Sequence, residues 1–238
     1  GQGITEAFVS AGATLVTSAR SEAEPFSGTT HVQCDVRDPE SVQAMVDRIV
    51  AKHGRLDVLI NNAGGAPSAS AAEASPRFHD KIIALNLNAP LLVAQIANRA
   101  MQEQGSGGSI VNISSIAGLY GNAGQASYSS AKASLVGLTR TMCKEWGRYK
   151  VNVNCVAFGL INTRLTQPIE AQQKTIDVAG RDIKVGVQPQ MLDAMARMIP
   201  LGRGGTPEEA ADAVYLFCSP ESNYISGQVV VAGGGLLI

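Results

Sequence analysis

The sequence predicts a single α/β domain built on a doubly wound parallel sheet. Short apolar strands alternate with amphipathic helices along the 238 residues. The strands read as nearly continuous apolar runs, which indicates a sheet covered by helices on both faces. No repeat or low-complexity linker divides the chain, so we place no domain boundary, and right-handed crossovers then fix most of the topology.

The first part of the chain predicts two strand–helix units. In order, we expect a helix over 4–11, strands over 13–19 and 31–35, a helix over 38–53 and a strand over 56–61. Pro39 suits the first turn of the second helix, because its missing N–H would have no partner there. The loop between the first two strands is rich in Ser, Glu, Pro and Gly.

The rest of the chain continues the alternation. We expect helices around 77–104, from about 127, and over 207–219, with strands over 109–114, 151–156 and 228–231. Residues 165–199 are the least regular segment, with a helical stretch near Met191 to Met198. Connections this long are uncommon in compact domains, so we expect a flap that shapes the substrate site.

Composition excludes several classes of function. The net charge of −1 supplies no electrostatic footprint for nucleic acid or an anionic membrane, and no segment reads as a membrane span or export signal. The four cysteines and three histidines lack metal-ligand spacing, and the cysteines suggest no disulfide framework. We therefore expect a cytoplasmic protein without a metal ion.

Residues 104–131 contain no charged side chain and are bounded by Glu103 and Lys132, so we expect this stretch to be largely buried. Tyr128 and Lys132 are spaced i and i+4 and would share one face of a helix. A nearby ammonium lowers a tyrosine pKa, which would make Tyr128 a general acid or base. The alternative interpretation is a pair on a surface helix.

Other candidate residues fall at the carboxyl edge of the predicted sheet, where open α/β sheets bind ligands. The strand over 109–114 delivers Ser115 to this edge, and Asn61-Asn62-Ala63-Gly64 ends another strand there. The second motif could equally be an ordinary Asn-Gly turn. Gly3, close to a helix start, could let a phosphate approach the first-turn amides.

Together these motifs resemble the classical short-chain dehydrogenase/reductase family over essentially the whole chain. In family order the matches are Gly1-Gln2-Gly3-Ile4, Asp35-Val36, Asn61-Asn62-Ala63-Gly64, Asn86, Ser115 and Tyr128-x-x-x-Lys132, with Ser115 preceding Tyr128 by 13 residues. In the C-terminal third, the matches are residues 154–159 with Ile161 and Thr163, residues 200–203, Pro207-Glu208-Glu209 and Ser226-Gly227-Gln228.

The resemblance implies a Rossmann-type domain that transfers a hydride between a nicotinamide and a carbonyl or secondary alcohol. Tyr128 would exchange the alcohol proton and Ser115 would hold the carbonyl oxygen. Lys132 would lower the tyrosine pKa and bind ribose hydroxyls, and Asn86 would anchor a water that links Lys132 to solvent. The implied cofactor-binding residues are Gly1, Gly3, Ile4, Arg20, Asp35, Val36, Asn62, Ala63, Gly64, Tyr128, Lys132, Gly159, Ile161 and Thr163.

The end of the second family strand bears on the choice of cofactor. An acidic residue there would accept hydrogen bonds from the ribose 2′-hydroxyl of NAD(H), but this chain has Ala19 followed by Arg20. A guanidinium suits a 2′-phosphate, so we expect NADP(H), with NAD(H) as the alternative. Arg20 could also be an ordinary surface arginine.

Within that family the pattern is most similar to reductases of 3-oxoacyl thioesters on acyl carrier protein, so we expect a small-molecule or acyl-thioester substrate. One alternative is an NAD(H)-dependent dehydrogenase of a steroid, sugar alcohol or other secondary alcohol, with Met191, Met195 and Met198 lining an apolar pocket. Another is a catalytically silent nucleotide sensor on the same fold.

Family members associate through the helices that carry Asn86 and Tyr128, so we expect a homotetramer or homodimer. Small residues on the second of these helices would permit close packing: Ala131, Ala133, Ser134 and Gly137.

The sequence departs from the family pattern in three ways. Phe158 replaces a proline, which could reshape the loop beside the nicotinamide. Thr5 stands where the third glycine of the cofactor turn is expected, which could loosen helix packing there. The first strand and the first glycine of that turn are absent, so we expect the natural chain to begin some ten or more residues earlier.

Overall fold

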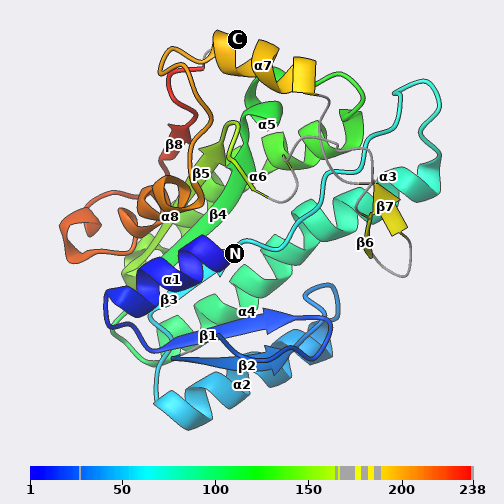
Figure 1. The fold of residues 1–238 in the computed structure, drawn as a ribbon. Coiled ribbons are helices and arrows are strands. Elements are labelled where there is room, and N and C mark those ends of the chain that lie inside the picture. The colour runs from blue at the N-terminus through cyan, green and yellow to red at the C-terminus, as the bar shows by residue number, and fades with distance from the viewer. Residues whose placement is uncertain (27, 164–165, 167–174, 178–181, 185–188, 237–238) are drawn as a thin grey trace.

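The computed structural model describes residues 1–26, 28–163, 166, 175–177, 182–184 and 189–236. It shows parallel strands flanked by helices, which confirms the predicted fold class (Figure 1). The strands are β1 (Leu15–Ala19), β2 (Thr29–Gln33), β3 (Val58–Asn61), β4 (Gly108–Ser115), β5 (Val151–Phe158), β6 (Thr175–Asp177), β7 (Asp182–Lys184) and β8 (Val229–Ala232).

The strands form two parallel sheets and one small hairpin. The larger sheet has the order β3-β4-β5-β8, β1 pairs with β2, and β6 pairs with β7 in an antiparallel arrangement. The register of the larger sheet aligns Asn61 with Asn112, and Ser115 with Phe158. The carboxyl ends of its strands therefore meet at one edge, as the sequence predicted.

The helices follow the predicted alternation. They are α1 (Gln2–Ser10), α2 (Pro39–His53), α3 (Pro76–Ile83), α4 (Ala89–Glu103), α5 (Ile116–Tyr120), α6 (Ala126–Trp146), α7 (Pro189–Met198) and α8 (Pro207–Tyr215). The helix expected over 77–104 is interrupted by a π-turn, η1 (Ala84–Asn88). Two short 3₁₀ turns, η2 (Gly147–Tyr149) and η3 (Pro220–Ser222), complete the described elements.

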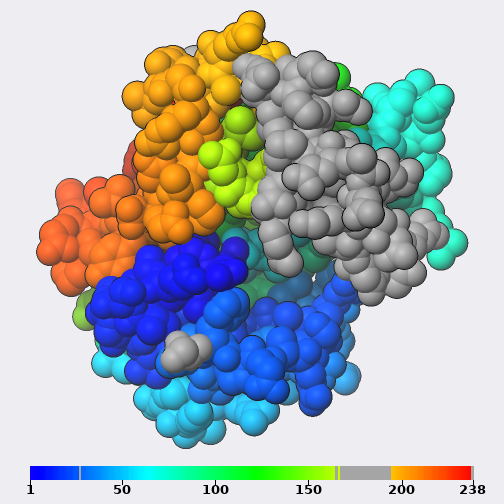
Figure 2. Space-filling view, in the orientation of Figure 1, coloured from blue at the N-terminus to red at the C-terminus, as the bar shows by residue number. Residues whose placement is uncertain are grey.

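Helices cover both faces of the larger sheet. On one face, Met101 of α4 and Met142 of α6 pack against Ile110 of β4. On the other face, Phe8 of α1 and Val214 of α8 pack on the same sheet. Figure 2 shows α1, in blue, lying directly against the orange segment that contains α8.

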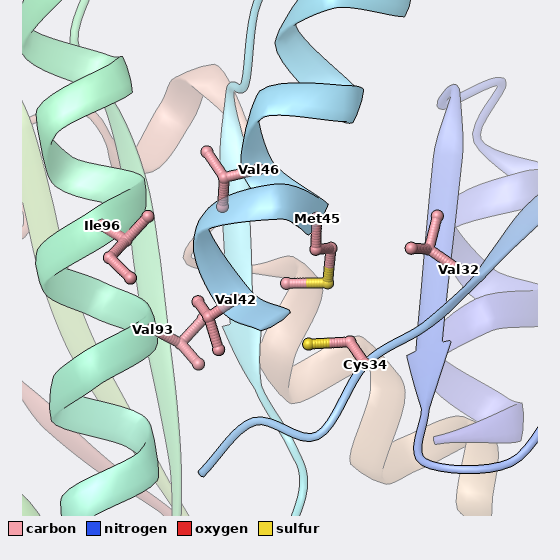
Figure 3. Close-up of a cluster of buried hydrophobic side chains, with 7 residues drawn as sticks. All are labelled: Val32, Cys34, Val42, Met45, Val46, Val93 and Ile96. Atoms are coloured by element: carbon pink, nitrogen blue, oxygen red, sulfur yellow. The ribbon is translucent and has the colours of Figure 1, made fainter. Parts of the chain in front are cut away.

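Within the described residues, no strand pairing joins the β1–β2 sheet to the larger sheet. A cleft of about 590 Å³ lies between β1 and β3, and its lining includes Val16 and Ile60. An apolar cluster of β2, α2, α4 and the chain after β2 holds the smaller sheet in place (Figure 3). Its buried members are Val32, Cys34, Val42, Met45, Val46, Val93 and Ile96.

The uncharged stretch 104–131 is only partly buried. Residues 110–114 of β4 are buried, but residues 121–123 form an exposed turn between α5 and α6. The prediction of a largely buried stretch was therefore wrong for this turn, because a lack of charge does not require burial where Gly, Asn and Ala make a loop. Among the described residues, no helix is both long and apolar enough to cross a bilayer.

Candidate active site

The site forms where β4 ends and α6 begins. Ser115 is the last residue of β4 and the N-cap of α5, where its Oγ accepts a hydrogen bond from the backbone N–H of Ala117 at 3.2 Å. Gly118 lets α5 approach α6 at backbone contact, since a Cβ there would lie 2.6 Å from the carbonyl carbon of Lys132. This packing places Ser115 beside Tyr128, where a hydrogen bond from the Ser115 side chain lowers the pKa of Tyr128.

Lys132 is 3% exposed and held from two sides. Its Nζ donates a hydrogen bond to the carbonyl oxygen of Ile113 at 2.7 Å. The Oγ of Ser114 donates to the backbone carbonyl of Lys132 at 2.8 Å. Burial penalises the charged form and lowers the pKa of Lys132 to about 8.

Tyr128 shares a face of α6 with Lys132, whose Nζ lies 5.7 Å from the centre of the phenol ring. Burial raises the pKa of Tyr128, and the hydrogen bond with Ser115 opposes that shift. The expectation that Lys132 lowers this pKa was therefore wrong for the structure as it stands. The spacing predicted the neighbouring ammonium correctly, but desolvation of the phenolate sets the direction of the pKa shift.

Asn86 lies in the π-turn η1 and is fully buried. Its Oδ1 accepts from the N–H of Gly65 at 3.2 Å, and its Nδ2 donates to the carbonyls of Gly65 and Ile82, each at 3.0 Å. The Asn86 amide therefore clamps the loop after β3 in place. A Cβ on Gly64 would lie 2.9 Å from Asn86 Oδ1 and 3.5 Å from Lys132 Nζ, so only glycine fits between them.

The sequence analysis missed a buried series of side-chain hydrogen bonds that lies next to these residues. The Nδ2 of Asn61 donates to Asn112 Oδ1 at 3.0 Å, and the Nδ2 of Asn112 donates to Thr139 Oγ1 at 2.9 Å. Asn61 also donates to the carbonyl of Pro90 at 3.1 Å. This series links β3, β4, α4 and α6. A polar Asn112 inside an apolar strand was the available signal.

Several predicted cofactor residues line the cleft between β1 and β3: Gly1, Ile4, Val36, Asn62 and Ala63. Gly1 is the N-cap of α1, and a Cβ on it would lie 3.3 Å from the side-chain amide of Asn62. Backbone amides at a helix start beside a strand edge fit the phosphates of a dinucleotide.

Gly3 and Thr5 both bear on how α1 packs against the rest of the domain. A Cβ on Gly3 would lie 2.7 Å from the carbonyl oxygen of Pro207, so Gly3 allows α1 to pack closely on α8. Thr5 is buried and lines the cleft, and close helix packing is retained despite the missing third glycine.

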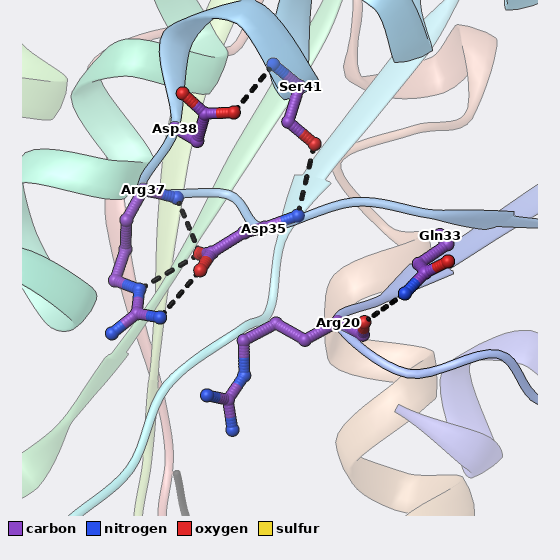
Figure 4. A network of polar contacts seen from close by, with 6 residues as sticks. All are labelled: Arg20, Gln33, Asp35, Arg37, Asp38 and Ser41. Carbon is purple, nitrogen blue, oxygen red and sulfur yellow. Dashed lines mark hydrogen bonds and ion pairs between the residues drawn. The ribbon is translucent and has the colours of Figure 1, made fainter.

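Charged residues gather at the ends of β1 and β2 (Figure 4). Arg37 donates to the Asp35 carboxylate through Nε at 2.9 Å and Nη2 at 2.5 Å, and its backbone N–H adds a third bond. These bonds lower the pKa of Asp35 to about 2. The Arg20 side chain lies beside this pair, where its charge also lowers the pKa of Asp35, and its carbonyl accepts a hydrogen bond from the Gln33 side chain at 2.8 Å. Sequence reasoning missed Arg37.

The C-terminal cofactor residues lie beyond the carboxyl end of β5. A Cβ on Gly159 would lie 2.7 Å from the Cα of Gly233, so two backbones cross closely there. Ile161 forms an isolated parallel bridge with Gly205, and the N–H of Thr163 donates to Thr166 Oγ1 at 2.8 Å. Phe158, the unexpected residue in this motif, ends β5 and packs into the cluster shared with α1 and α8.

In the flap expected over 165–199, residues 165, 167–174, 178–181 and 185–188 lie outside the described residues. The predicted helix near Met191–Met198 is present as α7. Met195 packs against a small cluster of Leu160, Ile199 and Leu236, whereas Met198 is exposed. The described part of the methionine row therefore does not face a single pocket, and the side chain of Met191 lies outside the description.

Comparison with known proteins decides the family. A family model described as Enoyl-(Acyl carrier protein) reductase matches residues 1–237. The chain belongs to the short-chain dehydrogenase/reductase family. It is 35% identical to the 3-oxoacyl-(acyl-carrier-protein) reductase FabG of Thermotoga maritima over 248 residues, which span 100% of this chain and 93% of that protein.

The chain is also similar to family members that act on other substrates. The chain is 34% identical to the human (3R)-3-hydroxyacyl-CoA dehydrogenase, over 91% of this chain and 77% of that protein. It is 31% identical to the 2-dehydro-3-deoxy-D-gluconate 5-dehydrogenase of Escherichia coli, over 85% and 74% respectively. A crystal structure of a short chain dehydrogenase from Bacillus anthracis superposes with a TM-score of 0.83 at 30% identity, covering 99% and 91%.

Membership in the short-chain dehydrogenase/reductase family makes the protein an oxidoreductase that acts on CH–OH and C=O groups with a nicotinamide cofactor, NAD(P)(H). The architecture and the whole-chain match agree on this conclusion.

Proposed function

We propose that the protein is an NADP(H)-dependent reductase of 3-oxoacyl thioesters. The observation that supports it best is the half-buried Ser115–Tyr128 pair beside the buried Lys132, at the carboxyl edge of the larger sheet. The full set of groups needed for proton transfer to a carbonyl oxygen meets there, which argues against a catalytically silent nucleotide sensor.

The proton chemistry is assigned to this chain's own residues. When bound, the nicotinamide supplies the hydride. Tyr128 donates a proton to the carbonyl oxygen in the reductive direction, and its raised pKa keeps it protonated at neutral pH. Ser115 holds that oxygen by a hydrogen bond. Lys132, fixed by Ile113 and Ser114, holds the ribose hydroxyls with its ammonium group.

The preference for NADP(H) rests on charge at the end of β1. Arg20 follows β1 directly, and the last residue of that strand is Ala19 rather than an acid. A guanidinium forms strong charge-assisted hydrogen bonds with a phosphate, whereas a ribose 2′-hydroxyl is best held by a carboxylate.

The substrate class rests on the relatives. Two of them carry 3-oxoacyl or 3-hydroxyacyl groups in their names, at 35% and 34% identity. The sugar-acid dehydrogenase at 31% identity keeps a sugar alcohol as the second candidate.

A substrate panel tests the proposal. β-Ketothioesters, steroid ketones and sugar ketones are each mixed with NADPH or NADH, and loss of cofactor absorbance is followed. We expect the highest kcat/KM with a β-ketothioester and NADPH. Comparable values for NADH would refute the cofactor preference, and a lack of turnover with every substrate despite NADPH binding would favour the sensor alternative.

We propose that the enzyme is a homotetramer or homodimer that packs through α4 and α6. Ala133, Ser134 and Gly137 are exposed on α6, and a Cβ on Gly137 would meet no atom within 4 Å. Such a face lets two helices approach closely. Ala131, expected on the same face, is instead buried inside its own subunit. Sedimentation showing a monomer at micromolar concentration would refute this proposal.

A further inference from the structure

The start of α6, which carries Tyr128, has no side-chain cap bond, although Gln125 is hydrogen-bonded to Asn122 in the turn before it. Its N-cap Gln125 makes no side-chain cap bond, unlike Ser75 at the start of α3. The first N–H groups of a helix have no partner within the helix, so an uncapped first turn depends on contacts from elsewhere in the protein. Tyr128 lies in this turn and must hold its position for proton transfer.

Besides the hydrogen bond between Tyr128 and Ser115, two further hydrogen bonds from the described residues outside α6 hold this turn. The backbone N–H of Ala69 donates to the carbonyl of Gly124 at 2.8 Å, just before the helix starts. His79 Nδ1 and Ser127 Oγ lie 3.0 Å apart in a hydrogen bond between α3 and α6. Ser127 is 5% exposed and directly precedes Tyr128. Within the described residues, His79 is its recorded side-chain partner.

His79 lies in the capped first turn of α3. Ser75 Oγ caps α3 by accepting from the N–H of Phe78 at 3.2 Å, and the N–H of His79 donates to the carbonyl of Ser75 at 3.0 Å. The same run of helix continues through η1 to Asn86, whose amide clamps Gly65. The His79–Ser127 bond therefore joins the helix that carries Asn86 to the helix that carries Tyr128.

We infer that His79 and Ser127 are positioning residues, which act on the reaction by fixing the first turn of α6 so that Tyr128 meets Ser115 and the substrate oxygen. The inference rests on the proposed function. Neither residue is assigned contact with substrate or cofactor. A displacement of about 1 Å in a reacting group can reduce the rate by up to about 100-fold.

Kinetics of a double-mutant cycle test the inference. We expect Ser127→Ala and His79→Leu each to lower kcat about tenfold with an unchanged Kd for NADPH. The kcat of the double variant should equal that of the less active single variant within about twofold, because both substitutions remove the same hydrogen bond. His79→Asn should restore kcat, since its amide offers a donor and an acceptor at the same distance from Cβ as Nδ1.

The matched control is Ser130→Ala, which removes an exposed hydroxyl that bonds within α6 to the carbonyl of Ala126. This variant should keep wild-type kcat. Independent losses that multiply in the double variant, wild-type kcat in Ser127→Ala, or no rescue by His79→Asn would each overturn the inference.

A second measurement separates this inference from the proposed function. Amide hydrogen exchange at residues 126–130 should be faster in Ser127→Ala than in the wild type and unchanged in Ser130→Ala. An inactive wild type with this exchange pattern would refute the proposed function but keep the cross-helix anchor. Wild-type exchange rates in Ser127→Ala would overturn the anchor whatever the activity.

Discussion

The region around β4 and α6 differs from the ends of β1 and β2 in how it treats polar groups. In the first region, Lys132, Asn112 and Ser114 are buried, and each is hydrogen-bonded to a neighbouring element. In the second, Arg37 and Asp35 pair at the surface with side chains 37% and 34% exposed.

The contrast indicates that the region around β4 and α6 fixes the positions of reacting groups, whereas the ends of β1 and β2 supply charge for ligand selection. Buried and fully bonded groups hold one position, which proton transfer requires. Exposed charges are screened by solvent, so they contribute little to stability but can still select a charged ligand. Substitutions in the first region should therefore change turnover, and substitutions in the second should change cofactor selection with little effect on folding.

Tyr128→Phe should cause the largest effect. It removes the hydroxyl that exchanges the proton and keeps the ring, so turnover should fall by at least about 100-fold. The Kd for NADPH should stay close to that of the wild type. Steady-state rates and a binding titration check both points, and retained activity would refute the role of Tyr128.

Arg20→Ala should come next and should act on one cofactor alone. Loss of a hydrogen bond to a charged group costs about 1.5–3 kcal/mol, so kcat/KM for NADPH should fall about 10- to 100-fold. The value for NADH should hardly change. Arg48→Ala is the matched control, because Arg48 is an exposed arginine on α2 that does not line the cofactor cleft. Equal losses for both cofactors would contradict the proposed 2′-phosphate contact.

The pH dependence should reveal the burial of Lys132. The proposed role of Lys132 requires its ammonium form, and burial lowers the Lys132 pKa to about 8. The kcat/KM for reduction should therefore be level below pH 8 and fall about tenfold per unit above it. A profile that stays level to about pH 9.5 would contradict the role of Lys132.

The contribution of Lys132 to the free energy of unfolding should rise with pH, whereas kcat/KM should fall. Because the folded-state pKa of Lys132 is below its ordinary value of 10.5, the unfolded chain binds more protons between these values. The contribution of Lys132 to the free energy of unfolding therefore rises with pH in that window. Chemical unfolding at pH 7.5 and 9.5, two values on either side of the pKa of about 8, distinguishes lost chemistry from lost folding.

Local patterns predicted the parts of the site that depend on short spacing. The i, i+4 spacing placed Tyr128 and Lys132 on one helix face, and the position of Ser115 after an apolar strand placed it at the sheet edge. The Asn61–Asn112 bond joins residues 51 apart, and only strand register brings them together. Burial likewise decides the direction of the Tyr128 pKa shift, and spacing alone cannot show burial.

Arg37→Ala should have the smallest effect and completes the contrast between the two regions. The pKa of Asp35 is lowered to about 2 from its ordinary value of 3.8, first through the hydrogen bond from Arg37. A lowered carboxyl pKa stabilises the fold above the ordinary value, and this contribution is lost as pH falls toward 2. Because both side chains are more than about one-third exposed, the variant should lose less than about 1 kcal/mol at pH 7.

Urea unfolding should show the difference from wild type shrinking between pH 4 and pH 2, the range between the two pKa values. A loss above about 2 kcal/mol would mean that this pair is as structural as the buried series of hydrogen bonds next to Lys132, and the proposed difference between the two regions would fail.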